Sequence, residues 1–137
     1  MALILDAGAL IAFESSNPVV LALLNDAHVR SVPVKTTSGA TAQVWRDRAK
    51  QLQLTLLLRG VDEQPIDTES SPRIGSILTA ASVTDIVDGS LIEIASDGDE
   101  ILTTDPDDIV HLASAAGRRL VIIPISTCND AINPRIT

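Results

Sequence analysis

The chain of 137 residues, 45% hydrophobic and 20% charged, is long enough for one domain with a buried core and too apolar for a disordered protein. Its formal net charge of −8 disfavours long-range attraction to nucleic acid or an anionic membrane, and one Phe, one Trp and no Tyr disfavour an RNA-binding surface of stacked rings. A single cysteine excludes an internal disulfide. Because the sequence shows no signal peptide and no apolar stretch of about 20 residues, we expect a soluble, cytoplasmic protein without membrane association.

Strand patterns and helix patterns alternate along the chain. In chain order, the predicted elements are a strand over 3–5, helices over 7–13 and 17–27, a strand over 31–35, a helix over 37–46 whose pattern continues to 58, a strand over 61–66, helices over 69–81 and 83–95, a strand over 100–104, a helix over 106–116 and a strand over 120–125. Asn17 and Pro18 are typical of a helix start, Gly60 and Gly117 of helix ends, and Pro65 weakens the strand over 61–66.

The most apolar predicted strands alternate with helices, which predicts an α/β fold with a parallel sheet covered on both faces. The sequence contains no repeat or linker, so we expect one domain over residues 1–125. Residues 126–137, which contain two Asn and one Pro, are predicted to form a loosely ordered C-terminal tail.

Acidic residues follow two of the predicted buried strands. Asp6 comes directly after the strand over 3–5, and Asp105 comes after the strand over 100–104. The carboxyl ends of the strands in such a sheet share one crevice, where ligands bind. Carboxylates gathered there repel each other unless a cation holds them together. These two positions therefore suggest a metal site.

Two further acids are placed to join this site. Asp85 and Asp88 are three residues apart, as are Asp105 and Asp108, and this spacing puts each pair on one face of a helix. Magnesium prefers hard oxygen ligands and keeps several waters, so a few carboxylates suffice to bind it. A metal-bound hydroxide can attack a phosphodiester, which makes hydrolysis of nucleic acid one function of such a site.

Each acid also has a purely structural explanation. Asp6 and Asp105 can be N-caps that accept backbone N–H hydrogen bonds of the next helix. Asp85, Asp88 and Asp108 can be first-turn acids that complement a helix dipole. Both explanations stay open for each residue taken singly.

Four short motifs, in this order and spacing, make the chain resemble PIN-domain nucleases, particularly the VapC toxins of bacteria. The motifs are LILDAGALIA at residues 3–12, AQVWR at 42–46, DIVDGSL at 85–91 and LTTDPDD at 102–108. The likeness extends over residues 1–125. It implies a three-layer α/β/α domain, a Mg²⁺- or Mn²⁺-dependent endoribonuclease activity that cleaves RNA through a metal-activated water, a cognate antitoxin protein, and a homodimer.

The resemblance assigns roles residue by residue. Asp6, Asp88 and Asp105 take the first, third and fourth acidic positions, and we expect them to be the catalytic residues and the metal ligands. Asp85 and Asp108 are expected to be supporting acids, and Thr104 to hydrogen-bond a carboxylate or a metal-bound water.

Gln43 departs from the pattern of the family, which usually has Glu at this second acidic position. An amide oxygen still accepts a hydrogen bond but carries no charge, so we expect weaker binding of a divalent ion unless Asp85 compensates. Among neighbouring residues, we expect Trp45 in the core or an interface, Arg46 and His111 at the surface, and Gly8 at a close packing contact beside Asp6.

Two other functions remain as alternatives. The first is a degenerate PIN fold that only binds partners, with an antitoxin arginine in the acidic site and residues 52–58 as core or as a groove for a partner helix. The second is a phosphoryl-transfer protein on a doubly wound sheet. A phosphatase of that kind needs Asp where Gly8 stands, and a receiver domain needs a late lysine, whereas no lysine follows Lys50.

Overall fold

The structure, a computed structural model, describes residues 1–126. Its centre is one sheet of five parallel strands in the order β3-β2-β1-β4-β5. The strands are β1 (Leu3–Leu5), β2 (Val34–Thr37), β3 (Asp62–Gln64), β4 (Glu100–Thr103) and β5 (Val121–Pro124). The predicted parallel α/β sheet is confirmed, whereas the loose tail predicted over 126–137 lies outside the described part except for its first residue.

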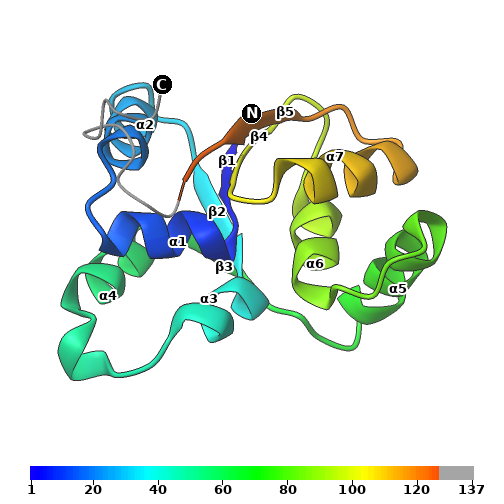
Figure 1. The fold of residues 1–137 in the computed structure, drawn as a ribbon, viewed down its shortest axis with the longest axis horizontal. Coiled ribbons are helices and arrows are strands. Elements are labelled where there is room, and N and C mark those ends of the chain that lie inside the picture. The colour runs from blue at the N-terminus through cyan, green and yellow to red at the C-terminus, as the bar shows by residue number, and fades with distance from the viewer. Residues whose placement is uncertain (127–137) are drawn as a thin grey trace.

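Helices cover both faces of the sheet and make three layers (Figure 1). They are α1 (Ala7–Glu14), α2 (Pro18–Val29), α3 (Ser38–Val44), the 3₁₀ turn η1 (Arg48–Lys50), α4 (Leu52–Arg59), α5 (Ser70–Ala81), α6 (Ile86–Ile94) and α7 (Pro106–Ala115). The apolar core is split accordingly: one cluster contains residues of α1 to α4, and the other contains residues of α5 to α7.

Successive side chains along a strand belong to different core clusters. Leu3 and Leu5 of β1 belong to the cluster on the α1–α4 side, and Ile4 between them belongs to the other. Leu102 and Ile101 of β4 divide in the same way. Successive side chains of a strand point to opposite faces, so runs without polar residues are expected where both faces are covered.

The strand order creates one crevice. β1 lies in the middle of the sheet, with β2 on one side and β4 on the other, so the chain winds outward in opposite directions from β1. The carboxyl ends of β1 and β4 therefore meet at the topological switch point, where open α/β sheets bind ligands.

The predicted continuous helix from 37 to 58 is wrong, because the chain leaves the helix at Trp45 and re-enters it at Leu52. The cause is the buried side chain of Gln51. Its amide nitrogen donates to the carbonyl of Val44 at 2.8 Å, and its amide oxygen accepts from the backbone N–H groups of Arg46 and Asp47 at 2.7 and 3.0 Å. One amide thus satisfies the backbone groups that the break in the helix exposes.

Two element boundaries also differ from the prediction. The strand expected at 31–35 forms at Val34–Thr37, where the hydroxyl of Thr36 is buried and donates to the carbonyl of Leu5 at 2.8 Å. The helix expected from 83 begins at Ile86, because Asp85 is its N-cap. In both cases a short polar side chain that bonds the backbone sets the boundary.

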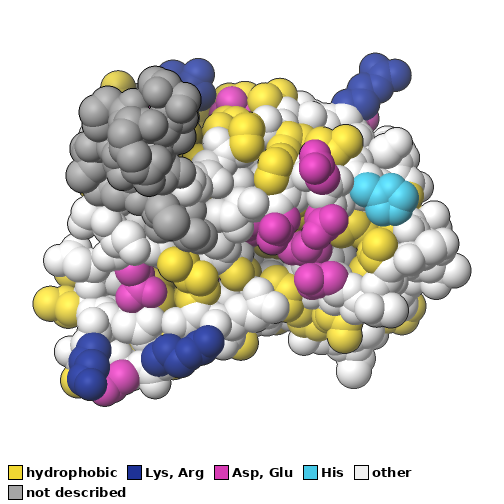
Figure 2. Space-filling view, viewed as in Figure 1, with side chains coloured by type: hydrophobic (Ala, Val, Ile, Leu, Met, Phe, Trp, Pro, Cys, Tyr) yellow, Lys and Arg dark blue, Asp and Glu magenta, His cyan; other side chains and the backbone are white. Residues whose placement is uncertain are grey.

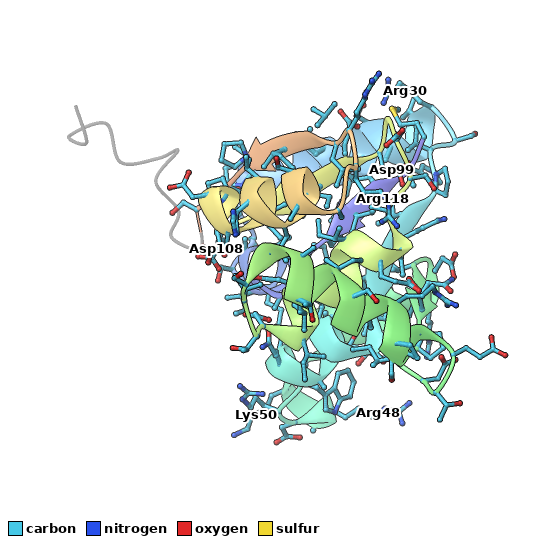
Figure 3. The ribbon with its side chains drawn as sticks, turned by 90° about the vertical axis from the view of Figure 1, so that its right-hand side faces the viewer. Arg30, Arg48, Lys50, Asp99, Asp108 and Arg118 are labelled. Atoms are coloured by element: carbon cyan, nitrogen blue, oxygen red, sulfur yellow. The ribbon has the colours of Figure 1, made fainter. Side chains whose placement is uncertain are left out.

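Long-range hydrogen bonds fix the amino-terminal edge of the sheet. The buried carboxylate of Asp99 accepts from the backbone N–H groups of Ala2 at 2.8 Å and Ser96 at 2.9 Å. The guanidinium of Arg118 donates to the carbonyls of Ile92 and Ala95 at the end of α6, where a cation complements the helix dipole (Figure 3). These contacts lie at the opposite edge of the sheet from the crevice.

Within residues 1–126, no single helix has the length and apolar content needed to cross a membrane. Helices α1 and α2 meet these criteria only as a pair, and they are bent by 104° relative to each other.

Replacing Gln51 should destabilise the fold. The Gln51→Ala variant leaves the Val44 carbonyl and two N–H groups without their partner, so we expect the free energy of unfolding in urea to fall by about 1–3 kcal/mol. Gln53→Ala on the exposed face of α4 is the matched control and should change it by less than about 0.5 kcal/mol. Equal losses of unfolding free energy in the two variants would show that Gln51 does not stabilise the break between α3 and α4.

Candidate functional site

Asp6 joins the ends of β1 and β4. Its side chain is 3% exposed, and its two oxygens accept hydrogen bonds from the backbone N–H groups of Ala9 at 2.7 Å and Thr104 at 3.2 Å. Burial raises the pKa of Asp6 above its ordinary value of 3.8, the Asp105 carboxylate raises it further, and the hydrogen bonds, including one from the Thr103 hydroxyl, oppose the rise. Asp6 is therefore an N-cap and also part of a group of interacting carboxylates.

Gly8 permits the close approach that this arrangement needs. A Cβ atom at Gly8 would lie 2.0 Å from the side-chain oxygen of Thr104 and 2.8 Å from its Cβ. No side chain fits at that distance, so only glycine lets the first turn of α1 pack against the residue after β4. The predicted close packing contact at Gly8 is confirmed.

Asp105 does not use its side chain to cap α7. It occupies the N-cap position, but no cap hydrogen bond to its carboxylate is found, and its own backbone N–H donates to the Thr103 hydroxyl at 2.9 Å. The carboxylate is exposed at the crevice. Helix capping, the structural explanation considered for both residues, therefore explains part of the role of Asp6. It does not explain the side chain of Asp105.

Helix α6 brings a second pair of acids to the same place. Asp85 is its N-cap and accepts from the backbone N–H of Asp88 at 3.0 Å. The hydroxyls of Thr37 and Ser90 lie 2.8 Å apart, and Ser90 donates to the carbonyl of Val87 at 2.6 Å, so Thr37 donates to Ser90. This buried link ties the first turns of α6 to the end of β2.

Asp88 is at the electrostatic centre of the site. Its pKa is raised from 3.8 to about 7, first by burial and then by repulsion from four other carboxylates, those of Asp85, Asp6, Asp105 and Asp108. Electrostatic repulsion that raises a pKa in this way acts between charges that lie near one another. The structure therefore brings together all five acids that the sequence singled out.

The acidic side chains form a visible patch at the centre of one face (Figure 2). Beside it, Asp85, Asp88, Asp108 and His111 line a cavity of about 340 Å³. The ion pairs found in residues 1–126, Arg30–Asp26 and Arg73–Glu93, involve none of these acids. Several neighbouring carboxylates without a basic partner provide the oxygen ligands that a hard divalent cation prefers.

The carboxylates are not already arranged as the ligands of one ion. Among the described residues, no group of three or more His, Cys, Asp or Glu side chains lies close enough together to hold a metal directly. Asp6 is fixed by its hydrogen bonds, whereas Asp105 is exposed and free of a cap bond. The residues fit a cation by their chemistry, with waters or side-chain rotation completing its shell.

Gln43 and Thr104 are the uncharged residues among those predicted to support the site. Gln43 lies exposed on α3 and is not among the residues that line the cavity. Thr104 bonds Asp6 through its backbone N–H, and its side chain faces Gly8. Sequence reasoning missed Thr103, whose buried hydroxyl bonds Asp6 and Asp105; a polar residue at an otherwise apolar strand end is the signal that marks it.

His111 is exposed, as expected, but it also borders the acidic cavity. Its Nε2 atom lies 2.7 Å from the carbonyl of Ala81. A carbonyl only accepts, so Nε2 carries a proton and donates it to this bond. His111 therefore links α7 to the end of α5 at the edge of the site.

No protein-family model matches the chain, and no curated protein matches it either. The functional assignment therefore rests on the residues of the site and on their arrangement.

A methyl group at Gly8 should disturb the site. We expect Gly8→Ala to lower the free energy of unfolding by about 1–3 kcal/mol, because Thr104 must move away from Asp6. The control is Gly75→Ala in α5, where an added Cβ meets nothing within 4 Å. That change should leave the unfolding free energy unchanged or raise it by about 0.5–1 kcal/mol, the helix preference of Ala over Gly. A similar loss of unfolding free energy in Gly8→Ala and Gly75→Ala would show that the close contact between Gly8 and Thr104 is not important for stability.

The raised pKa of Asp88 gives a pH dependence of known sign. Between pH 4 and 7 the folded state keeps a proton on Asp88 that the unfolded chain releases, so this residue makes the metal-free protein less stable as the pH rises through that window. We expect Asp88→Asn to be more stable than the parent at pH 8 by about 1–2 kcal/mol, since solvent weakens the full effect, and equally stable at pH 3. Unfolding in urea with EDTA measures this difference, and Asp26→Asn serves as the exposed control. If the stability difference between Asp88→Asn and the parent became smaller as the pH rises, the raised pKa of Asp88 would be contradicted.

Proposed function

We propose that this protein is a metal-dependent endoribonuclease of the PIN-domain, VapC-like type, inhibited by a cognate antitoxin. The observation that carries the proposal is the set of four carboxylates that raise the pKa of Asp88 at the switch point of a parallel sheet. The order of the four sequence motifs supports the same family.

Asp6, Asp88 and Asp105 are the residues that would hold Mg²⁺ or Mn²⁺. A divalent ion at this place supplies a water of lowered pKa and neutralises charge on the phosphoryl oxygens of RNA. Each residue contributes differently: Asp6 is a fixed anchor, Asp88 must lose its proton to bind a cation, and the exposed Asp105 is free to orient a water.

Asp85 and Asp108 support the site through charge. Both border the cavity beside Asp88 and raise its pKa. Their negative potential attracts a cation, and it repels RNA unless that cation is bound. The negative net charge is therefore compatible with a nuclease only when the site holds its metal.

The phosphoryl-transfer alternative is less compatible with the geometry. It requires Asp6 to attack a phosphorus atom, yet this carboxylate is 3% exposed and both of its oxygens accept hydrogen bonds. The binding-module alternative has one observation in its favour, because an uncharged amide, Gln43, stands at the second acidic position of the family pattern. In that case an arginine of the antitoxin takes the place of the cation.

The proposed protein partners require an apolar contact surface. Leu52 and Leu56, one turn apart on α4, are 61% and 46% exposed, whereas Leu54 between them is fully buried. This supports the interpretation of residues 52–58 as part core and part interface. A second copy of the chain in a homodimer and the antitoxin are the partners that we propose.

Removing one carboxylate tests the nuclease activity. We expect Asp88→Asn to reduce cleavage of RNA in Mg²⁺ by about 100-fold or more and to relieve growth arrest on expression, because a ligand and its charge are lost. Asp107→Asn is the matched control, since Asp107 is an exposed acid of the same region that neither lines the cavity nor affects the pKa of Asp88. Full activity of Asp88→Asn would overturn the assignment. A wild-type protein that neither cleaves RNA nor binds Mg²⁺ by calorimetry would favour the binding module.

A further inference from the structure

A second cavity, outside the acidic site, has a different chemical character. It measures about 420 Å³, within the usual size of small-ligand pockets. Trp45 and Arg48 border it from the connection between α3 and α4, Thr55 and Arg59 from α4, and Glu63 from β3. An aromatic ring, two guanidinium groups and short polar side chains thus meet around one space.

Positive charge is concentrated at this place in an otherwise acidic protein. Four of the ten basic residues lie between positions 46 and 59, namely Arg46, Arg48, Lys50 and Arg59. Basic side chains lie over the α3–α4 connection (Figure 2). Arg48 and Lys50 lie at the same end of the molecule, with Arg48 on the side opposite to Asp108 (Figure 3). The ion pairs found within residues 1–126 engage none of them.

Trp45 is held with its ring between the core and the cavity. It is half-buried, it packs against the core cluster on the α1–α4 side, and its backbone N–H donates to Thr41 at 2.8 Å. Arg46 donates to the carbonyl of Trp45 at 2.8 Å, so this arginine is used to hold the connection. The part of the ring that borders the cavity can stack against a nucleobase, which a single aromatic residue in a pocket suffices to do.

Thr41 adds an unsatisfied polar group at the same cavity. Its hydroxyl is the one buried side-chain polar atom in residues 1–126 that lacks a hydrogen-bond partner, and Thr41 is among the residues that line the cavity. A buried hydroxyl without a partner is uncommon in folded proteins. Because the hydroxyl itself is buried, Thr41 contributes to the wall of the cavity and not to its polar contacts.

We propose that this cavity binds one nucleotide of single-stranded RNA, with the base against Trp45 and the flanking phosphates at Arg48 and Arg59. The inference rests on the proposed function, for which RNA is the substrate. Glu63 at this cavity can accept a hydrogen bond from an exocyclic amine of a base that lies against Trp45. The cavity then supplies the attraction for RNA that the acidic centre lacks.

The fluorescence of Trp45 measures this binding without any cleavage. Trp45 is the only tryptophan and the chain contains no tyrosine, so its emission reports this cavity alone. With the full chain in EDTA, a short single-stranded oligoribonucleotide of mixed sequence should quench the emission to a saturating limit. In the Arg48→Gln/Arg59→Gln variant we expect about tenfold weaker binding, and a slope of log K against log salt reduced by about 1.4, for two lost phosphate contacts.

The control variant removes two positive charges elsewhere. Arg73→Gln/Arg119→Gln has the same net charge as the test variant, and neither residue lines the cavity; its affinity should stay within about twofold of the parent. Absence of quenching in the parent, or equal weakening in both variants, would overturn the proposal. An emission that changes with protein concentration or with an acidic peptide, and not with RNA, would also overturn it and identify a protein contact.

The outcomes for the two proposals can be told apart. Cleavage without quenching in the parent would reject the nucleotide pocket and leave the nuclease intact. Saturable quenching that depends on Arg48 and Arg59, without cleavage in Mg²⁺, would reject the nuclease and support the pocket.

Discussion

Repulsion among carboxylates at the ends of β1 and β4 is the constraint on which the rest of the site depends. Asp6 is buried there, and Asp88 is close enough to four other acids that its pKa rises to about 7. Like charges in a partly buried site destabilise the fold unless they are protonated or neutralised by a cation. A protein that keeps them together has a use for their combined charge, which is why the arrangement indicates a metal site more strongly than any single acid does.

Several packing contacts and hydrogen bonds hold the acids in place against this repulsion. The Gly8–Thr104 approach fixes α1 against the end of β4, the Thr37–Ser90 link ties α6 to β2, and Asp85 caps the helix that carries Asp88. Each contact joins segments that are distant in the sequence or sets the start of a helix. Rigid support of this kind is what a site needs to keep its geometry when its own charges oppose it.

Local patterns account for much of the fold. The apolar run at residues 3–5, the Asn17-Pro18 start of α2 and the alternation that sends Leu3 and Ile4 to opposite faces are all set by neighbouring residues. The break at Trp45 was not predictable in this way, because it depends on the buried Gln51 amide. The placement of β2 depends likewise on threonine hydroxyls that bond across strands.

The site follows the same division. The positions of Asp6 and Asp105 at strand ends and the helical spacing of Asp85 and Asp88 could be predicted, whereas the contribution of Thr103 required the tertiary structure. The cavity at Trp45 also arises only when α3, α4 and β3 come together. The molecule thus presents an acidic centre and a separate basic region, although the net charge describes only the excess of acid.

The most direct test of the cation site is the melting temperature of the protein at pH 8 in increasing Mn²⁺. At this pH Asp88 has lost its proton, so the repulsion is at its greatest. A ligand that binds only the folded state raises the melting temperature in a saturable way. We expect such a rise, well beyond that produced by sodium chloride at equal ionic strength. An equal rise of the melting temperature with Mn²⁺ and with sodium chloride would contradict a cation site formed by these carboxylates.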